Sequence, residues 1–243
     1  MNYLKAVLQP ASLFSMRLPY THQSALTYPL PPPSTILGML AAALQRAEDR
    51  PPLECLEEIE AGIDTCAALV DEDMPVAARS CVVSLITKIQ AAGEGKVTDA
   101  LPRQFAHTHR VALLAFSEDA PLLDRLAQVL TRSPVTLGGS ESLAAPQELT
   151  VAEAAVEEVA AGELISTRGY VPRDLLDTDS LGERHSLFWV HERCLGADEL
   201  VAYLYPVMLD GYVYRPAPIE GALAWNGTCY RADGETVLTH HSR

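Results

Sequence analysis

The order of the predicted elements indicates an α+β protein with one ferredoxin-like domain and a smaller β-rich C-terminal elaboration. Across residues 1–160 the sequence predicts strand, helix, strand, strand, helix and a further strand, the βαββαβ order of that fold. Residues 161–243 contain mostly short strand patterns. The 243 residues are 48% hydrophobic and 21% charged, a globular composition that excludes a mostly disordered chain.

The first strand and helix follow from alternation and from helix-start signals. Residues 2–9 alternate as a strand does, whereas residues 10–33 are irregular and end in a proline-rich run. Residues 36–44 are apolar at helical spacing, and either Ser34 or Thr35 can cap the first turn. Gly38 costs helix stability, which suggests that another backbone packs close to it. An exposed acidic helix is expected over residues 53–62.

The second half of the domain begins with a long strand. Residues 76–90 are rich in β-branched side chains, and a glycine-containing turn follows at 91–95. Residues 109–116 predict another strand, and residues 121–130 an amphipathic helix that begins with a proline. Residues 147–160 fit either a strand or a helix.

The C-terminal third has weaker signals. Its polar tail, from residue 230 onward, is expected to be partly frayed. Four short strand patterns precede or overlap this tail, at residues 186–191, 201–205, 211–214 and 219–225.

Charge limits the partners of the chain as a whole. It has 18 Lys+Arg against 32 Asp+Glu, a net charge of −14, so its overall field repels nucleic acid and anionic membranes. Two stretches, residues 1–47 and 79–110, are nevertheless basic. They fit either chance fluctuation or a local anion-binding face, and on charge alone we favour chance.

The sequence disfavours several other classes of protein. No apolar run reaches the length of a membrane span and the first residues lack the layout of a signal peptide, so a cytoplasmic protein is expected. The five cysteines are an odd number without a CxxC pair, which favours free thiols over disulfides or a zinc site. No P-loop, GxSxG or HExxH motif is present, and we expect neither a cofactor nor a metal.

One histidine pair offers catalytic chemistry. His107 and His109 are spaced to lie on one side of a strand, and two imidazoles can serve as general acid and base in RNA cleavage. The pair lacks a clear third ligand for a metal. Two exposed histidines at a strand edge are the alternative interpretation.

A glycine-containing loop and a basic hairpin offer binding chemistry instead. In residues 137–142, Gly138 and Gly139 let a phosphate approach the backbone, successive N–H groups form an anion nest, and Ser140 and Ser142 add hydroxyl donors. The alternative is a simple tight turn. The hairpin and its surroundings supply groups that can bind phosphates or unpaired bases, namely Lys88, Lys96, Arg103, Gln104, Tyr20 and Phe105. The alternative for each basic residue is a charge solvated by water.

Two N-terminal segments resemble the signature of the CRISPR-associated Cas-five family. They are Phe14-Ser-Met-Arg-Leu-Pro-Tyr-Thr and Tyr28-Pro-Leu-Pro-Pro-Pro-Ser-Thr-Ile-Leu-Gly-Met-Leu-Ala-Ala-Ala43. Leu137-Gly-Gly-Ser-Glu-Ser also resembles the glycine-rich loop of this family and of the wider RAMP superfamily. The resemblance covers residues 1–160, matches the C-terminal third only loosely, and is greatest to the type I-B or I-A form.

The resemblance implies a fold and a function. The family has an RRM-like (RAMP) ferredoxin domain with a β-hairpin thumb, which here would lie within residues 84–106. The resemblance implies that this chain is a non-catalytic subunit of a type I Cascade surveillance complex. Members of the family belong to such complexes. They hold the 5′ handle of the CRISPR RNA (crRNA) and contact the large subunit and the terminal backbone subunit. Target DNA beside the adjacent motif is a further partner that the resemblance leaves open.

The resemblance also implies which residues touch the handle. The start of the first helix suits phosphate because its N–H groups and dipole attract anions. With Ser142 of the glycine-containing loop added, the full RNA-binding set comprises Arg17, Tyr20, His22, Ser34, Thr35, Lys88, Arg103, Gln104, Gly138, Gly139, Ser140 and Ser142. A net charge of −14 requires this basic surface to be confined to one face.

An endoribonuclease is the alternative function. Members of the type I-C form cleave precursor RNA with a Tyr, Lys and His group. This sequence has no comparable triad, and the nearest candidates for a metal-independent reaction are His107, His109 and Lys88.

Overall fold

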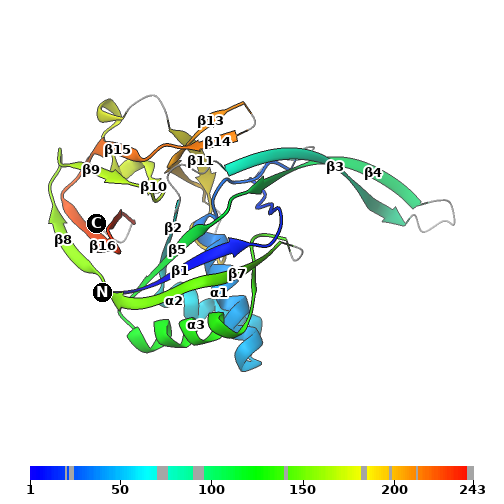
Figure 1. Ribbon diagram of the computed structural model, residues 1–243, viewed down its shortest axis with the longest axis horizontal. Coiled ribbons are helices and arrows are strands. Elements are labelled where there is room, and N and C mark those ends of the chain that lie inside the picture. Colours follow the sequence, from blue (N-terminus) through cyan, green and yellow to red (C-terminus); the bar gives the residue numbers. More distant parts are fainter. Residues whose placement is uncertain are drawn as a thin grey trace.

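A five-stranded antiparallel sheet with helices on one face organises the protein, which we describe from a computed structural model (Figure 1). The structure describes residues 1–19, 21, 25–69, 76–89, 96–139, 142–181, 185–196, 199–211 and 213–239, without the side chains of residues 69, 82–89 and 96–101. In order across the sheet, the strands are β2 (Asp64–Leu69), β5 (Val111–Ser117), β1 (Asn2–Pro10), β7 (Leu143–Glu153) and β6 (Val135–Thr136). The predicted α+β class is confirmed.

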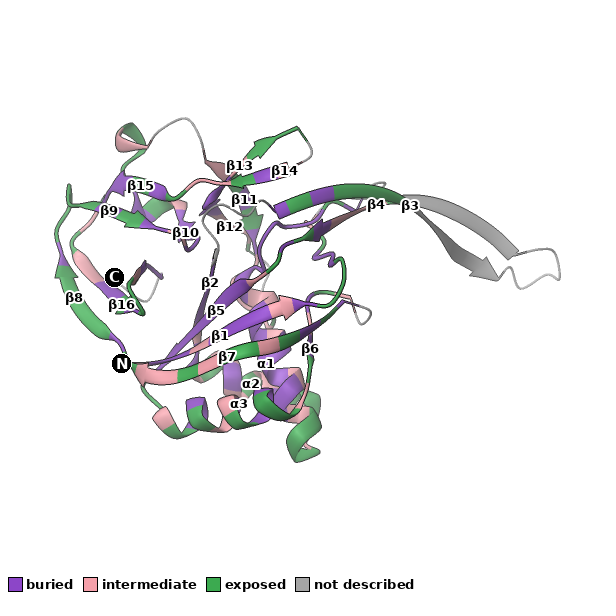
Figure 2. Ribbon diagram, in the orientation of Figure 1, coloured by how far each residue is buried: buried purple, intermediate pink, exposed green. Residues whose placement is uncertain are grey.

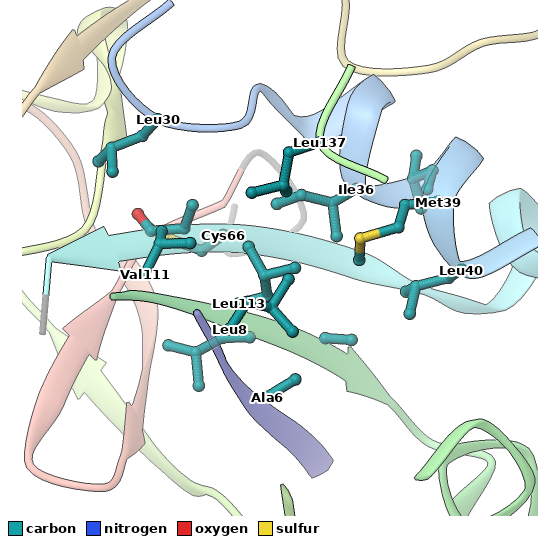
Figure 3. Close-up of a cluster of buried hydrophobic side chains, with 14 of the residues drawn as sticks. Ala6, Leu8, Leu30, Ile36, Met39, Leu40, Cys66, Val111, Leu113 and Leu137 are labelled. Atoms are coloured by element: carbon teal, nitrogen blue, oxygen red, sulfur yellow. The ribbon is translucent and has the colours of Figure 1, made fainter. Parts of the chain in front are cut away.

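Three helices cover one face of this sheet: α1 (Pro33–Glu48), α2 (Pro52–Gly62) and α3 (Ala120–Arg132) (Figure 1). Apolar side chains of α1 pack against β1 and β5, as Figure 3 shows for Ile36 and Leu40 with Leu8 and Leu113. Burying each such side chain stabilises the fold by about 1.5–3 kcal/mol.

The third helix is built as its sequence predicts. Asp119 caps α3, because its carboxylate accepts the N–H of Leu122 at 3.0 Å, and a proline occupies the first turn. The side chains of Leu122, Leu126, Val129 and Leu130 are buried. The acidic helix α2 is also where the sequence placed it, and it buries only Cys55 and Ile59.

The start of α1 differs from the prediction. The helix begins at Pro33, and no side chain caps it, so Ser34 and Thr35 lie inside the first turn. Proline suits the first helical position because its missing N–H would have no helical partner. The prediction for Gly38 is wrong: a Cβ there would meet the Sγ of Cys194 at 3.8 Å, an ordinary contact with a side chain.

The predicted second strand lies outside the five-stranded sheet. Residues 76–90 instead supply β3 (Val76–Ile89), which pairs with β4 (Lys96–His107) as a long hairpin that projects from the body (Figure 1). The hairpin therefore begins earlier than the predicted thumb. At about 3.3 Å per residue, the 14 residues of β3 span about 46 Å. The predicted turn at 91–95 is outside the described residues.

The hairpin is fixed to the body at its base. There β14 (Val213–Pro216) pairs with the first residues of β3, Val76 and Ala77, and β13 (Val207–Asp210) extends the same sheet. Figure 2 shows buried residues of β3 and β4 at this end of the hairpin.

Small antiparallel sheets cover the other face of the five-stranded sheet (Figure 1). Phe116 of β5 stacks on Tyr230 with ring centroids 5.0 Å apart. The strands of these sheets are β8 (Ala155–Val159), β9 (Leu164–Thr167), β10 (Val171–Pro172), β11 (Ser186–Val190), β12 (Val201–Tyr205), β15 (Ile219–Ala222), β16 (Gly227–Ala232) and β17 (Glu235–Val237). Two short 3-10 helices, Arg173–Leu175 and Thr178–Ser180, complete the described elements.

Two segments for which the sequence predicted an uncertain or frayed structure form strands. Residues 147–160 belong to β7 and β8. The expectation of a frayed tail is wrong as far as residue 239, because β16 and β17 pair and the side chains of Tyr230, Val237 and Leu238 are buried.

One buried cluster runs from Tyr3 to Val237, so residues on both sides of position 160 share a core. All five cysteines are free thiols, of which only Cys81 and Cys194 are exposed. No helix in the described ranges combines the length and hydrophobicity that a membrane span requires.

Candidate nucleic-acid interface

One irregular segment contacts all three elements that the sequence predicts to bind RNA. The N–H of Phe14 donates to the carbonyl of Ala106 in β4 at 2.9 Å, and Ala25 bridges Arg103 of the same strand. Ser15 bridges Gly138 of the glycine loop. We call residues 14–19 and 25–28 the linking segment, because it joins the hairpin, the glycine loop and the start of α1.

The root of the hairpin, which we define as residues 76–81 and 102–107, presents cations on one face. In its register Cys81 is opposite Arg103 and Arg79 is opposite Phe105, and opposite residues share a face. The guanidinium of Arg103 lies 5.1 Å from the centroid of the Phe105 ring. Arg79 was absent from the predicted set, because only the pairing register places it beside Arg103.

The other face of the root packs against the linking segment. The side-chain carbonyl of Gln104 accepts the N–H of Thr27 at 3.0 Å, and the backbone N–H of Gln104 donates to Ala25 at 2.7 Å. The fold therefore already uses this side-chain carbonyl, and the contact of Gln104 with a base stays a prediction that only its side-chain N–H groups could fulfil. Gln104 positions the linking segment.

A groove of about 330 Å³ lies between the linking segment and the start of α1. Its polar lining comes from Arg17, Thr21, Ser34, Thr35 and His191. Arg17 is exposed, and its Nε donates to the hydroxyl of Thr21 at 3.4 Å. Within the described part of the chain, no carboxylate forms an ion pair with Arg17. The groove therefore combines a cation with hydroxyl groups.

The backbone amides at the start of α1 are already engaged. The N–H of Ser34 donates to the carbonyl of His191 at 3.3 Å, and those of Thr35 and Ile36 donate to Pro32 at 3.0 and 3.2 Å. Pro33 has no N–H. The prediction that these amides bind phosphate is therefore wrong, and the contribution of this helix to the groove is limited to side chains and the dipole.

The glycine loop is primarily a docking turn for the linking segment. Gly138 has φ = 86°, and a Cβ at this position would lie 2.2 Å from the carbonyl oxygen of Ser15. The side chain of Ser142 is buried and donates to the carbonyl of Leu13 at 3.2 Å, so its predicted role as a ligand is wrong. Gly139 accepts the N–H of Ser142 at 3.0 Å, which closes the turn.

The side chains of four predicted residues fall outside the described part of the chain. Tyr20, His22 and Ser140 are outside the described residues, and only the backbone of Lys88 is described. Lys88 pairs with Val97. It is seven residues along β3 from the partner of Arg103, which corresponds to about 23 Å. Lys88 and Arg103 would therefore contact different nucleotides.

The alternative catalytic group is not assembled. His107 ends β4, whereas His109 lies in a bend before β5, so the two do not alternate on one strand as predicted. Lys88 is eleven residues along β3 from the partner of His107, about 36 Å away. Across the described ranges, no three His, Cys, Asp or Glu side chains are arranged to hold a metal ion.

Comparison with known proteins agrees with the family suggested by the sequence. The model of the family described as CRISPR-associated protein (Cas_Cas5) matches residues 9–193. The chain belongs to the Cas5 family. A relative, CRISPR-associated protein Cas5 of Thermoproteus tenax, is 27% identical to this Cas5 chain over 229 residues, 86% of the chain and 88% of the relative.

Solved structures share the fold of this Cas5 chain. A CRISPR protein from Archaeoglobus fulgidus has a TM-score of 0.57 and 17% identity, with 98% of each chain covered. A chain of the type III-B Cmr-beta complex bound to cognate target RNA and AMPPnP has a TM-score of 0.50 and 13% identity, with 87% of this chain and 86% of that chain covered. At these identities the likeness concerns the fold alone.

Proposed function

We propose that this Cas5 family member is a structural RNA-binding subunit of a type I CRISPR Cascade, of the type I-B or I-A form. It caps the 5′ handle of the crRNA and contacts the large and backbone subunits, in the cytoplasm, during RNA-guided antiviral defence. It acts without catalysis of its own. The observation that carries the proposal is the linking segment: Arg17 bridges Thr27 and Ala25 bridges Arg103, so the backbones of the two arginines are two strand spacings apart and offset by two residues, about 12 Å in all.

The distribution of ion pairs supports this interface. Among the arginines that the structure describes elsewhere, most pair with carboxylates, which neutralises them within an acidic protein. Such pairs join Arg50 and Arg125 to Glu48 and Glu58, Arg168 to Glu235, Arg193 to Asp64, Arg215 to Asp210 and Arg231 to Glu157. Arg17 has no such carboxylate within the described residues, so the groove can attract a phosphate.

The helix-free face of the five-stranded sheet is covered, which supports a binding site for RNA at the side of the protein instead. The order β2–β5–β1–β7, with α1 and α3, corresponds to the ferredoxin-like unit that we propose. RRM domains bind RNA on the helix-free face of such a sheet. Here Tyr230 and Asp233 of the β16–β17 hairpin contact Phe116 and Lys5 on that face. The handle is therefore expected at the hairpin root and the groove.

Charge reversal in the reconstituted complex tests the proposal. We expect Arg17→Glu combined with Arg103→Glu to reduce crRNA retention at least tenfold, because both cations face the same strand of RNA. In the isolated chain, each Arg→Ala change should lower the salt dependence of RNA binding by about 0.7 in log–log slope.

The matched control is Arg132→Glu. Arg132 is exposed, as Arg17 is, but ends α3 on the helix-covered face. Retention of crRNA by this variant should equal that of the wild type. Unchanged retention by the double variant, with an unchanged thermal unfolding midpoint, would contradict the proposed interface.

A further inference from the structure

A tryptophan beside the groove is unusually exposed. Trp189 is 53% exposed and lies in β11, an edge strand. Phe188 and Val190 on either side are buried, and Leu187 is 46% exposed, so alternate residues of the strand point outward. An aromatic side chain of this size normally buries most of its surface.

The outward face of β11 continues into the groove. His191, two residues after Trp189, is the next residue on this face and lines the groove. Two residues of extended chain span about 6.6 Å. The hydroxyl of Tyr28, another lining residue, donates to the carbonyl of Trp189 at 2.5 Å and fixes that backbone at the rim. A ligand held by Arg17 therefore has an aromatic surface at the edge of its site.

We propose that Trp189 is a stacking platform for an unpaired base of the RNA whose phosphate is bound by Arg17. The inference rests on the proposed function and names a base-binding residue for the same site. Every base has a π-face, so stacking on an aromatic ring tolerates any sequence and accompanies cationic contacts to the backbone. The cation and hydroxyls of the groove fit a nucleotide better than they fit an apolar protein partner, which would leave them unpaired.

The test uses the full chain and two RNA probes, octa-adenylate and octa-uridylate. Trp189→Ala should weaken octa-adenylate binding about 5- to 150-fold, the range expected for the loss of one stacked base. Trp189→Tyr should bind within about threefold of the wild type because it keeps an aromatic face. The tighter binding of adenine than of uracil should disappear in Trp189→Ala.

Fluorescence gives a second measurement, because the chain has two tryptophans, Trp189 and Trp225. Octa-adenylate should quench the emission of the wild type but not that of Trp189→Tyr. The matched control is Leu209→Ala, which removes a side chain of 55% exposure on β13 that does not line the groove. Its affinity for both probes should be unchanged.

The outcomes separate this inference from the proposed function. If the wild type binds RNA and Trp189→Ala binds it equally well, the stacking role is overturned while the proposed function stands. Loss of a partner subunit by Trp189→Ala, with RNA binding intact, would overturn it too, and would assign the surface to a protein. If the wild type binds neither probe, the proposed function fails and the inference fails with it.

Discussion

The hairpin root and the start of α1 both lie against the linking segment, yet they offer different chemistry. At the root, Arg79 and Arg103 carry their charge on side chains beside an aromatic ring. At the helix start, the amides of Ser34, Thr35 and Ile36 are already bonded to backbone carbonyls. Positive charge in the groove therefore comes chiefly from the guanidinium of Arg17.

The difference shows that a helix start binds anions through its amides only if those amides lack partners in the fold. Their partners here include His191, which is distant in sequence and therefore invisible to local reasoning. A basic side chain on a strand depends less on such partners, because its charge persists wherever it points into solvent. We expect RNA affinity to depend more strongly on the root and Arg17 than on the helix start.

The largest expected loss of stability comes from displacing the linking segment, which contacts both regions. Gly138→Ala should lower the free energy of unfolding by about 3 kcal/mol, because a Cβ would overlap the carbonyl of Ser15 and the residue has positive φ. Urea unfolding measures the change. RNA affinity should fall as well, since the linking segment holds both regions.

Gly162→Ala is the matched control for this variant. Gly162 has the same φ of 86°, but a Cβ there has nothing within 4 Å. It should cost about 1 kcal/mol, from backbone strain alone. Equal costs for the two variants would show that the close approach of Gly138 to Ser15 does not matter.

The alkylation rates of the two exposed thiols should differ by an intermediate amount, and each rate reports on one of the two regions. Cys81 is opposite Arg103 at the hairpin root, whereas the Sγ of Cys194 donates to the carbonyl of Ser34 at 3.1 Å. Burial and the nearby Glu60 carboxylate raise the pKa of Cys194 to about 11. At pH 8 its thiolate is scarce, so alkylation of Cys194 should be at least tenfold slower than that of Cys81 and should accelerate up to about pH 11.

RNA should protect Cys81 from alkylation if the strand passes over the root. Mass spectrometry of iodoacetamide-treated chain, with and without RNA, measures both rates. The buried thiols of Cys55, Cys66 and Cys229 should stay unmodified in either case and serve as internal controls. An unchanged Cys81 rate in an RNA-saturated sample would place the strand away from the root.

Sequence reasoning succeeded where the signal is local. Helical periodicity located α1 and α3. The family resemblance grouped Ser34 and Thr35 with Arg17, and the three residues line one groove. The choice of second strand failed because β propensity does not identify pairing partners. Residues 76–90 have the stronger pattern, but the shorter β2 pairs with β5.

The roles of individual site residues were harder to predict, because contacts between distant segments decide them. Gln104 is engaged by Thr27, and Ser142 by Leu13. No local pattern distinguishes these polar side chains from ones that face a ligand. Arg79 and Trp189 were missed for the converse reason: their exposure beside the site depends on strand register and on which face of β11 is buried.

The smallest expected effect tests the helix start directly. Because its amides are bonded within the fold, only the hydroxyls of Ser34 and Thr35 can add hydrogen bonds to RNA from this turn. Each neutral hydrogen bond contributes about 0.5–1 kcal/mol, so Ser34→Ala with Thr35→Val should weaken RNA binding by about 5- to 30-fold. Fluorescence anisotropy with octa-adenylate measures this loss. The salt dependence should be unchanged, since no charge is removed. A loss larger than that of Arg17→Ala would reverse the ranking of the two regions and make the helix start the principal anion site.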